Sequence, residues 1–436
     1  MRLPHPCRDR SWSDRVGIST VVLPHPPPVQ CSVRILISAG EASGEMYGAQ
    51  LMQALHARLS CPDGASSQSS KDVGGTGALA HPIDDLEFFG VGGEKMRAAG
   101  CRTVVDAEDL AVVGITEILG HLPKIWGLFH RLIAEADAHR PDVAIVIDSP
   151  AFNWRVARQV KKRGIPVVYY VCPQFWAWRQ GRVKLLRKYV DKALVIFPFE
   201  EKFYRDRGVI AEFVGHPLAE LARPSISRTQ YGAQHQLDPA KPWITLMPGS
   251  RRKEVRMNLL TIAESATLLG NEYEFLLPVA PTLNSDYVRQ ILAHSAVNIP
   301  NLHLVPDALP ALAHSRAGIV ASGTATVEAA LMETPFVMVY RVTPLTYLLG
   351  RSTVKVPHFA MVNLIAEKRI VPEFVQRDFA AENVASALRE IIPNGQPREQ
   401  MLEGLREVRR RLRGTAGDQP APVRAAEAIA GFVTRR

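Results

Sequence analysis

The sequence contains few cysteines, and they lie far apart. Five cysteines are scattered over 436 residues. They form no C-x-x-C pair and no cluster with histidine, so the usual zinc-site patterns are absent. No apolar run approaches the roughly 18 to 20 residues that a membrane-spanning helix needs. We therefore expect reduced thiols, no metal site, no cofactor and a cytoplasmic protein that meets a membrane only peripherally.

Two common nucleotide-binding patterns are also absent. The chain has neither the Walker A pattern nor G-x-G-x-x-G. The turn after its first apolar run reads SAGEASGEMYGAQL, and its glycines are spaced differently, at Gly40, Gly44 and Gly48. Glu41 and Glu45 would repel a pyrophosphate held there. This excludes a dinucleotide site in the first turn and leaves a tight strand-to-helix turn as the simpler interpretation.

Basic residues exceed acidic ones. The 52 Lys and Arg against 43 Asp and Glu give a net charge of +9 and a pI near 9.4. Such a balance favours anionic partners without choosing among them, and part of it is ordinary solvated surface. A nucleic acid is one alternative partner, and its bases could stack on the aromatic pair of PQFWAWR. Because that pair lacks a clustered basic stripe, we expect no nucleic-acid partner.

Apolar runs alternate with helical patterns along most of the chain, which predicts parallel sheets covered by helices on both faces. The alternation stops in a polar stretch after His216 and restarts at WITLM. The sequence thus predicts an α/β protein with two Rossmann-like domains. The expected divisions are a disordered or non-native extension (1–33), a first domain (34–216) with a loop insertion (60–82), a second domain (217–379) and a helical tail that packs back on the first domain (380–436).

The stretch PGSRRKEV is the better phosphate candidate. It follows the strand WITLM, so Gly249 and Ser250 can present backbone N–H groups while Arg251 supplies positive charge. The alternative is an ordinary, solvent-facing start of a basic helix.

A second turn in the same half, SGTATVEAAL, adds small residues that allow a ligand close to the backbone. Gly323 and Thr324 lie at the start of the expected helix, where a threonine can cap it, and Glu328 lies about one turn further on. A carboxylate there can accept hydrogen bonds from a ribose diol. Together the two turns describe a sugar-nucleotide pocket.

Asp148 ends the buried strand VAIVID. A carboxylate at the carboxyl end of a parallel strand faces the crevice in which such sheets bind ligands, so Asp148 is a candidate general base. Capping of the following helix is the structural alternative.

The segment AVVGITEILGHLPKIW is amphipathic at helical spacing. A core-facing helix is the ordinary interpretation, and a membrane-surface helix is the alternative, since two glycines and a proline interrupt the pattern. Its apolar positions are Ile115, Ile118, Leu119, Leu122, Ile125 and Trp126.

Taken together, these motifs resemble those of the lipid-A-disaccharide synthases, inverting glycosyltransferases of the GT-B fold. The matching stretches are SAGEASGE, FFGVGG, AVVGITEIL, IDSPAFN, PQFWAWR, FVGHPL, LMPGSRRKEV, SGTATVEAAL and VNLIAE. They follow the family's order from about residue 34 to 372. One departure is Glu45, where the family often has aspartate.

The resemblance implies the reaction and its partners. UDP-2,3-diacylglucosamine would donate its sugar to 2,3-diacylglucosamine 1-phosphate (lipid X) at the inner face of the inner membrane, whose surface is anionic. Asp148 would be the base, Arg251 would neutralise the diphosphate without a metal, and Glu328 and Asn363 would lie on the donor side. We place the acceptor at the first turn and the aromatic stretch: Glu41, Ser43, Gly44, Trp178 and Arg179.

Three alternatives remain at this point. One is another GT-B enzyme acting on a soluble UDP-sugar, such as an epimerase. Another is a protein that binds lipid or nucleotide without turnover. A homodimer stays an alternative to a monomer.

Overall fold

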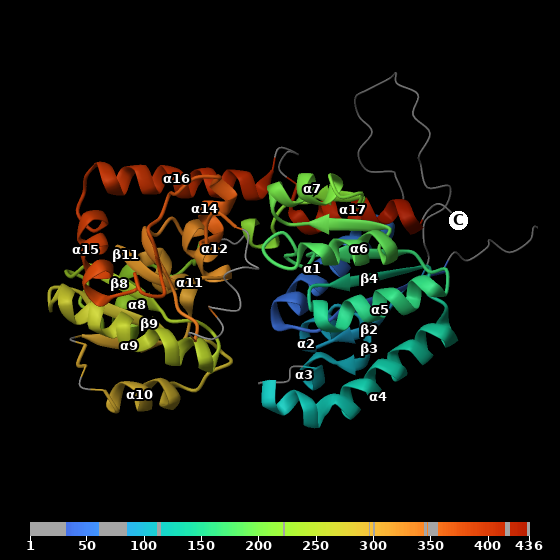
Figure 1. Ribbon diagram of the computed structural model, residues 1–436, viewed down its shortest axis with the longest axis horizontal. Helices are drawn as coiled ribbons and strands as arrows, with labels where there is room; N and C mark the ends of the chain where they lie inside the picture. Colours follow the sequence, from blue (N-terminus) through green and yellow to red (C-terminus); the bar gives the residue numbers. More distant parts are fainter. Residues whose placement is uncertain are drawn as a thin grey trace, which may run out of the picture.

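The computed structural model describes residues 32–60, 85–110, 115–220, 223–295, 297–299, 301–343, 347, 356–414 and 419–433. Most of the expected extension (1–31) and of the loop insertion (61–84) falls outside the described residues. The described chain forms two sheets, each wrapped in helices (Figure 1). This arrangement confirms the predicted pair of Rossmann-like domains.

The first sheet has seven parallel strands in the order β3-β2-β1-β4-β5-β6-β7. Its central strands are buried from end to end, because helices cover both faces of a parallel sheet. The strands are β1 (Ser32–Ala39), β2 (Asp85–Gly92), β3 (Cys101–Asp106), β4 (Val143–Ile147), β5 (Val167–Tyr170), β6 (Lys192–Val195) and β7 (Ala211–Phe213).

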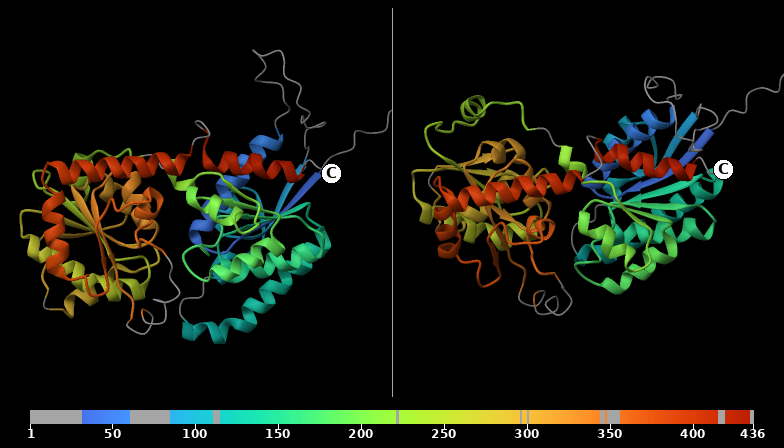
Figure 2. Two further views of the ribbon diagram at one scale, coloured as in Figure 1. Left: turned by 45° about the horizontal axis from the view of Figure 1, so that its top comes forward. Right: turned by 90° about the horizontal axis from the view of Figure 1, so that it is seen from above.

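Helices lie on both faces of this sheet (Figure 2). Apolar side chains of α4, α5 and α6 pack on one face, and those of α1 and α17 pack on the other. The helices of this half are α1 (Ala42–Ser60), α2 (Glu94–Ala98), α3 (Ala107–Leu110), α4 (Ile115–His139), α5 (Pro150–Lys162), α6 (Val183–Tyr189) and α7 (Pro198–Arg205).

The second sheet has six parallel strands in the order β10-β9-β8-β11-β12-β13. The strand order reverses beside β8, and ligands bind at such a reversal in open α/β sheets. The strands are β8 (Trp243–Met247), β9 (Glu274–Pro278), β10 (Leu302–Val305), β11 (Ala317–Ala321), β12 (Phe336–Tyr340) and β13 (Glu373–Val375). The helices are α8 (Arg228–His235), α9 (Arg252–Leu269), α10 (Ser285–Ala293), α11 (Ala308–His314), α12 (Thr324–Leu331) and α14 (Met361–Ala366).

The carboxyl-terminal helices are divided between the domains. α15 (Ala381–Ile391) packs on α9, and α16 (Gln396–Arg413) packs on α12 and α14. α17 (Ala421–Val433) packs on the first domain, where it lies along α1 (Figures 1 and 2), whereas α16 touches that domain only at its last turn. The expectation of a helical tail on the first domain is therefore correct for α17 alone.

Candidate active site

Asp148 lies in a strained turn at the carboxyl end of β4. Asp148 and Ser149 both have a left-handed backbone, with φ of 47° and 45°, which non-glycine residues adopt only when neighbours hold them. The hydroxyl of Tyr169 donates to the Asp148 carbonyl oxygen at 2.8 Å. Ser149 occupies the N-cap position of α5 without a side-chain cap. The Asp148 carboxylate is therefore not the capping group of α5.

Asn153 is the buried amide that fixes this turn. Its Nδ2 donates to the carbonyl oxygens of Ile147 at 2.8 Å and Asp148 at 3.0 Å. Its Oδ1 accepts from the Ser38 hydroxyl at 2.6 Å. Asn153 thereby ties the ends of β1 and β4 together and sets the position of Asp148.

The Asp148 carboxyl is poised to take a proton near neutral pH. Burial and the nearby charge of Glu41 raise its pKa to about 6, although the Ser149 N–H and the Arg251 charge lower it. Asp148 and Glu41 belong to the first domain, and Arg251 belongs to the second. The structure therefore brings the two predicted catalytic residues, Asp148 and Arg251, within electrostatic reach across the domains.

The acidic first turn packs against the Asp148 turn. A Cβ on Gly40 would lie 2.8 Å from the Ser149 hydroxyl oxygen, so only glycine fits there. Glu41 and Ser43 are exposed, and Gly44 is buried. Glu41 acts on Asp148 through its charge.

Glu45 has a structural role in this turn. Its Oε1 accepts from the Lys95 backbone N–H at 2.7 Å, at the start of α2. A carboxylate near a helix N-terminus is favourable for the same reason that an anion is. The longer side chain of glutamate thus binds the neighbouring helix.

Tyr47 is a site residue that the sequence motifs did not indicate. It is buried on α1, one turn beyond Gly44, and burial raises its pKa, with smaller contributions from Asp148 and Glu328. Its ring lies edge-on to His216 at 6.5 Å. Tyr47 therefore lies where the two domains meet, and its place inside the opening glycine turn was the available signal.

The PGSRR turn differs from its expected form. Glu254, in the first turn of α9, accepts from the N–H groups of Ser250 at 3.1 Å and Arg251 at 3.3 Å. Its other oxygen lies 3.5 Å from an Arg251 guanidinium nitrogen. The expectation of free backbone donors at Gly249 and Ser250 is corrected for Ser250, because a capping carboxylate occupies its N–H. The Arg251 side chain is 76% exposed despite this ion pair, so an anion can reach it from solvent.

Glu328 is a half-buried carboxylate on α12. Burial raises its pKa to about 7. The turn before it passes through Gly323, whose φ of 137° suits glycine. Thr324 is exposed, and the Thr326 hydroxyl donates to the Gly323 carbonyl oxygen at 2.8 Å. Neither threonine caps the helix by its side chain.

Asn363 is a buried amide bonded within the fold, and its assignment to the donor side stays a prediction. Its side chain is fully buried, and its Nδ2 donates to the Val371 carbonyl oxygen at 3.0 Å and to Glu373 at 2.7 Å. Its Oδ1 accepts from the N–H groups of Ile370 and Val371. These four bonds use the amide completely, so Asn363 joins α14 to β13 and has no donor left for a ligand.

The two tryptophans of the aromatic stretch PQFWAWR are divided between the core and the surface. Trp176 is buried and donates to Glu200 at 2.8 Å. Trp178 is 45% exposed, with the Arg179 guanidinium over its ring at 4.6 Å. Their assignment to the acceptor side stays a prediction.

The amphipathic segment forms the start of α4, which continues through Pro123. Trp126 is 63% exposed, whereas Ile125 is half-buried. The side chains of Ile115, Ile118, Leu119 and Leu122 lie outside the described residues. An exposed tryptophan at this place is what a membrane-surface helix needs.

Comparisons with known proteins decide the family. The model of the lipid-A-disaccharide synthetase family matches residues 35–424. The chain belongs to the lipid-A-disaccharide synthetase family. It is 50% identical to the lipid-A-disaccharide synthase of Koribacter versatilis, over 93% of this chain and all of that one, and 40% identical to the synthase of Solibacter usitatus, over 91% and 96%. It is accordingly a glycosyltransferase of lipid A disaccharide synthesis.

Two solved structures that match this fold are distant from the chain in sequence. The calicheamicin glycosyltransferase CalG4 matches with a TM-score of 0.55 at 15% identity, over 93% of this chain and 99% of that one. The UDP-GlcNAc 2-epimerase of Neisseria meningitidis matches with a TM-score of 0.56 at 12% identity, over 93% and 100%. These similarities show the shared GT-B fold of the lipid-A-disaccharide synthetases and nothing about substrate.

Proposed function

We propose that this enzyme transfers 2,3-diacylglucosamine from UDP to the 6-hydroxyl of 2,3-diacylglucosamine 1-phosphate. The products are UDP and a β-1,6-linked disaccharide phosphate. The observation that carries the proposal is the Asp148 carboxyl, whose pKa lies near 6 between the Glu41 and Arg251 charges. A carboxylate of this kind is suited to accept a hydroxyl proton at neutral pH.

The transfer step balances with these groups. The acceptor oxygen forms a bond to the anomeric carbon while the bond from that carbon to the UDP oxygen breaks on the opposite face. The electron pair of the broken bond leaves with UDP, and the acceptor proton passes to Asp148. Configuration at the anomeric carbon is thereby inverted.

The donor would bind to the second domain. The exposed Arg251 guanidinium would neutralise the charge that grows on the diphosphate, in place of a metal. Glu328 would accept hydrogen bonds from the ribose diol beside Gly323 and Thr324. A diphosphate arriving at the turn would compete with Glu254 for the N–H groups of Ser250 and Arg251.

The acyl chains require an apolar surface near the site. No helix within the described ranges is long and apolar enough to cross a membrane. We propose that α4 meets the inner face of the inner membrane through Trp126 and the apolar positions before it. Lipid X and the membrane surface are both anionic, which suits a protein of net charge +9.

The test uses both proposed substrates in detergent micelles. Purified enzyme is incubated with UDP-2,3-diacylglucosamine and radiolabelled lipid X, and UDP and labelled disaccharide are followed together. We expect equal amounts of the two products. UDP release without lipid X would favour a different UDP-sugar enzyme, and tight binding with no product would favour a non-catalytic binding protein.

A further inference from the structure

The segment from Pro150 to Val190 contains no acidic residue. Over these 41 positions the chain has ten basic side chains and not one Asp or Glu. The segment covers α5, β5 and α6: β5 is a strand of the first sheet, and α5 and α6 pack side by side on one of its faces (Figure 1). An excess of this size is the main source of the net charge, and it is gathered in one place.

The cations of the two helices point away from the sheet. On α5, Arg155, Arg158 and Lys162 are exposed at helical spacing, whereas Phe152 and Val156 are buried. The three exposed cations of α6 follow the same rule: Lys184, Arg187 and Lys188.

These two rows of cations meet over one aromatic ring. Arg158 from α5 and Lys188 from α6 lie 6.0 and 5.5 Å from the ring centre of Tyr189. Arg155 lies 5.3 Å from the ring centre of Trp154 in the same way. Arg158 and Lys188 thus bring the two helices together, and we call the exposed cations of both helices the α5–α6 surface: Arg155, Arg158, Lys162, Lys184, Arg187 and Lys188.

The elements next to the α5–α6 surface place little negative charge near its cations. Asp191 pairs with Lys161, and Asp137 pairs with Arg163. Within the part of the chain that the structure describes, none of the six cations of the α5–α6 surface makes an ion pair. A set of unpaired, exposed cations repels itself unless an anionic partner covers it.

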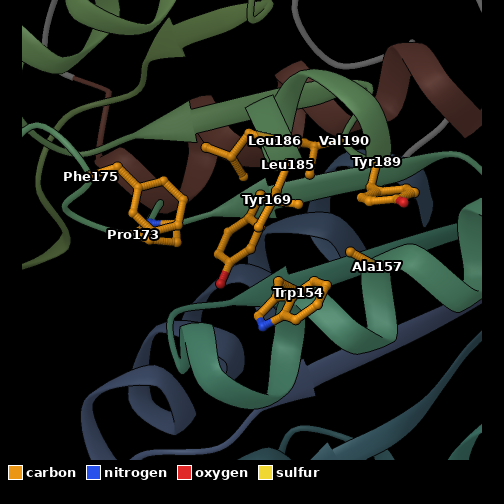
Figure 3. A pocket seen from close by; sticks show the side chains of 9 residues that line it. All are labelled: Trp154, Ala157, Tyr169, Pro173, Phe175, Leu185, Leu186, Tyr189 and Val190. Atoms are coloured by element: carbon orange, nitrogen blue, oxygen red, sulfur yellow. The ribbon is translucent and has the colours of Figure 1, made fainter. Parts of the chain in front are cut away.

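An apolar slot lies between the two helices that carry the cations (Figure 3). The slot between α5 and α6 is lined by apolar and aromatic side chains, and the half-buried rings of Trp154 and Tyr189 lie on either side of it. Tryptophan and tyrosine with one polar end, combined with long basic side chains, are the composition of an interface between water and lipid.

The α5–α6 surface also continues into the proposed membrane helix. The exposed ring of Trp126 on α4 stacks on Phe129, which in turn meets Phe152 of α5 edge-on, each pair at 6.0 Å. α5 begins at this same end, two residues after Asp148. One layer of helices thus runs from the exposed tryptophan to the reacting carboxylate.

We infer that the α5–α6 surface docks on an anionic phospholipid bilayer and holds the cleft against it. The inference rests on the proposed membrane-lipid substrates and names the surface that meets the membrane. A nucleic acid is the less favoured partner, because an arginine or lysine already lies over each of the rings of Trp154 and Tyr189, on which a base would have to stack.

The test compares two triple variants of the full chain in vesicle sedimentation. The first neutralises the α5–α6 surface with Lys162→Gln, Lys184→Gln and Lys188→Gln. The control neutralises three exposed cations of the second domain with Lys368→Gln, Arg369→Gln and Arg377→Gln. Both change the net charge equally, so a difference between them reports the place of the charge.

A basic residue near an anionic bilayer raises the binding constant roughly fivefold. We therefore expect the first variant to bind phosphatidylglycerol-containing vesicles about a hundredfold more weakly than the wild type, and the control to bind within about threefold of it. Binding of the wild type should fall as salt rises. Equal losses in the two variants, or none in the first, would overturn the inference.

Two further measurements separate this inference from the proposed function. Turnover in detergent micelles should be unchanged in the first variant, and its thermal unfolding should match the wild type. If the wild type makes no disaccharide in micelles, the proposed function fails while vesicle binding still reports the surface. Tighter binding of a short single-stranded RNA than of anionic vesicles, lost in the first variant, would make the surface a nucleic-acid site and overturn the inference.

Discussion

Asp148 is the residue whose chemistry depends most on its neighbours. Its pKa is raised to about 6 by burial and by the Glu41 charge. Only the ionised form can accept a proton, so kcat/KM should rise with pH through the pKa of the free enzyme. The opposing influences of Glu41 and Arg251 make this pH dependence adjustable by substitution.

Replacing Glu41 by Gln should move the acidic limb of the pH profile to lower pH. The substitution removes a like charge beside Asp148, so the pKa of Asp148 falls. The measurement is kcat/KM between pH 4.5 and 8, normalised to its plateau so that any loss of acceptor binding is divided out.

Glu45→Gln is the matched control on the same turn. Glu45 binds the start of α2, and we expect its substitution to leave the acidic limb in place. A shift of equal size in both variants, or an upward shift in Glu41→Gln, would contradict the assignment of Asp148 as the base.

At the scale of elements, Asn363 joins α14 to β13. Replacing it by Ala leaves buried donors and acceptors without partners, and each such group costs about 1 to 3 kcal/mol. We expect the second domain to unfold at a temperature several degrees lower, while the Kd for UDP at 10 °C stays within about threefold. An unchanged melting temperature with a much weaker Kd would instead place Asn363 at the donor site.

Strands that are buried on both faces were predictable because they are near-continuous apolar runs. β1, β4 and β8 follow this rule. β3, β7 and β13 do not show such runs, since β3 and β7 are the edges of the first sheet, β13 ends the second, and two of the three have only three residues. Short edge strands depend on pairing with a neighbour, which a local pattern does not record.

The gathering of candidate residues at one place was predictable where a side chain follows a strand, and their roles in the reaction stay predictions. Asp148, Arg251 and Glu328 belong to this class. Tyr47 and Glu254 were not predicted, because their roles depend on contacts that a local sequence pattern does not record. Tyr47 meets the second domain, and Glu254 closes the turn before its own helix. Asn363 shows the reverse case, in which a family match did not reveal that the amide is used up within the fold.

At the scale of the whole molecule, the two domains are joined where α16 ends. Gly215 has φ of 85°, and a Cβ there would collide with the guanidinium of Arg424 on α17. The N–H of His216 donates to the Leu412 carbonyl oxygen of α16 at 3.0 Å. This junction holds α17 on the first domain while α16 stays on the second.

Gly215→Ala should therefore lower the free energy of unfolding by more than backbone strain alone would lower it. A left-handed backbone costs alanine about 1 to 2 kcal/mol, and the clash with Arg424 adds to it. Gly164→Ala is the control, because Gly164 has φ of 78° and open space around its Cβ position. We expect a clearly larger fall in the free energy of unfolding for Gly215→Ala, measured by denaturant titration; equal losses would mean that Arg424 does not constrain the junction.

The central claim is that Asp148 removes the acceptor proton. The most direct measurement is single-turnover formation of the disaccharide by Asp148→Asn, together with its Kd for UDP. An amide cannot take the proton, so we predict that the rate falls by about 10² to 10⁴ while the Kd for UDP stays within about threefold. A rate within a few-fold of the wild type would contradict the claim.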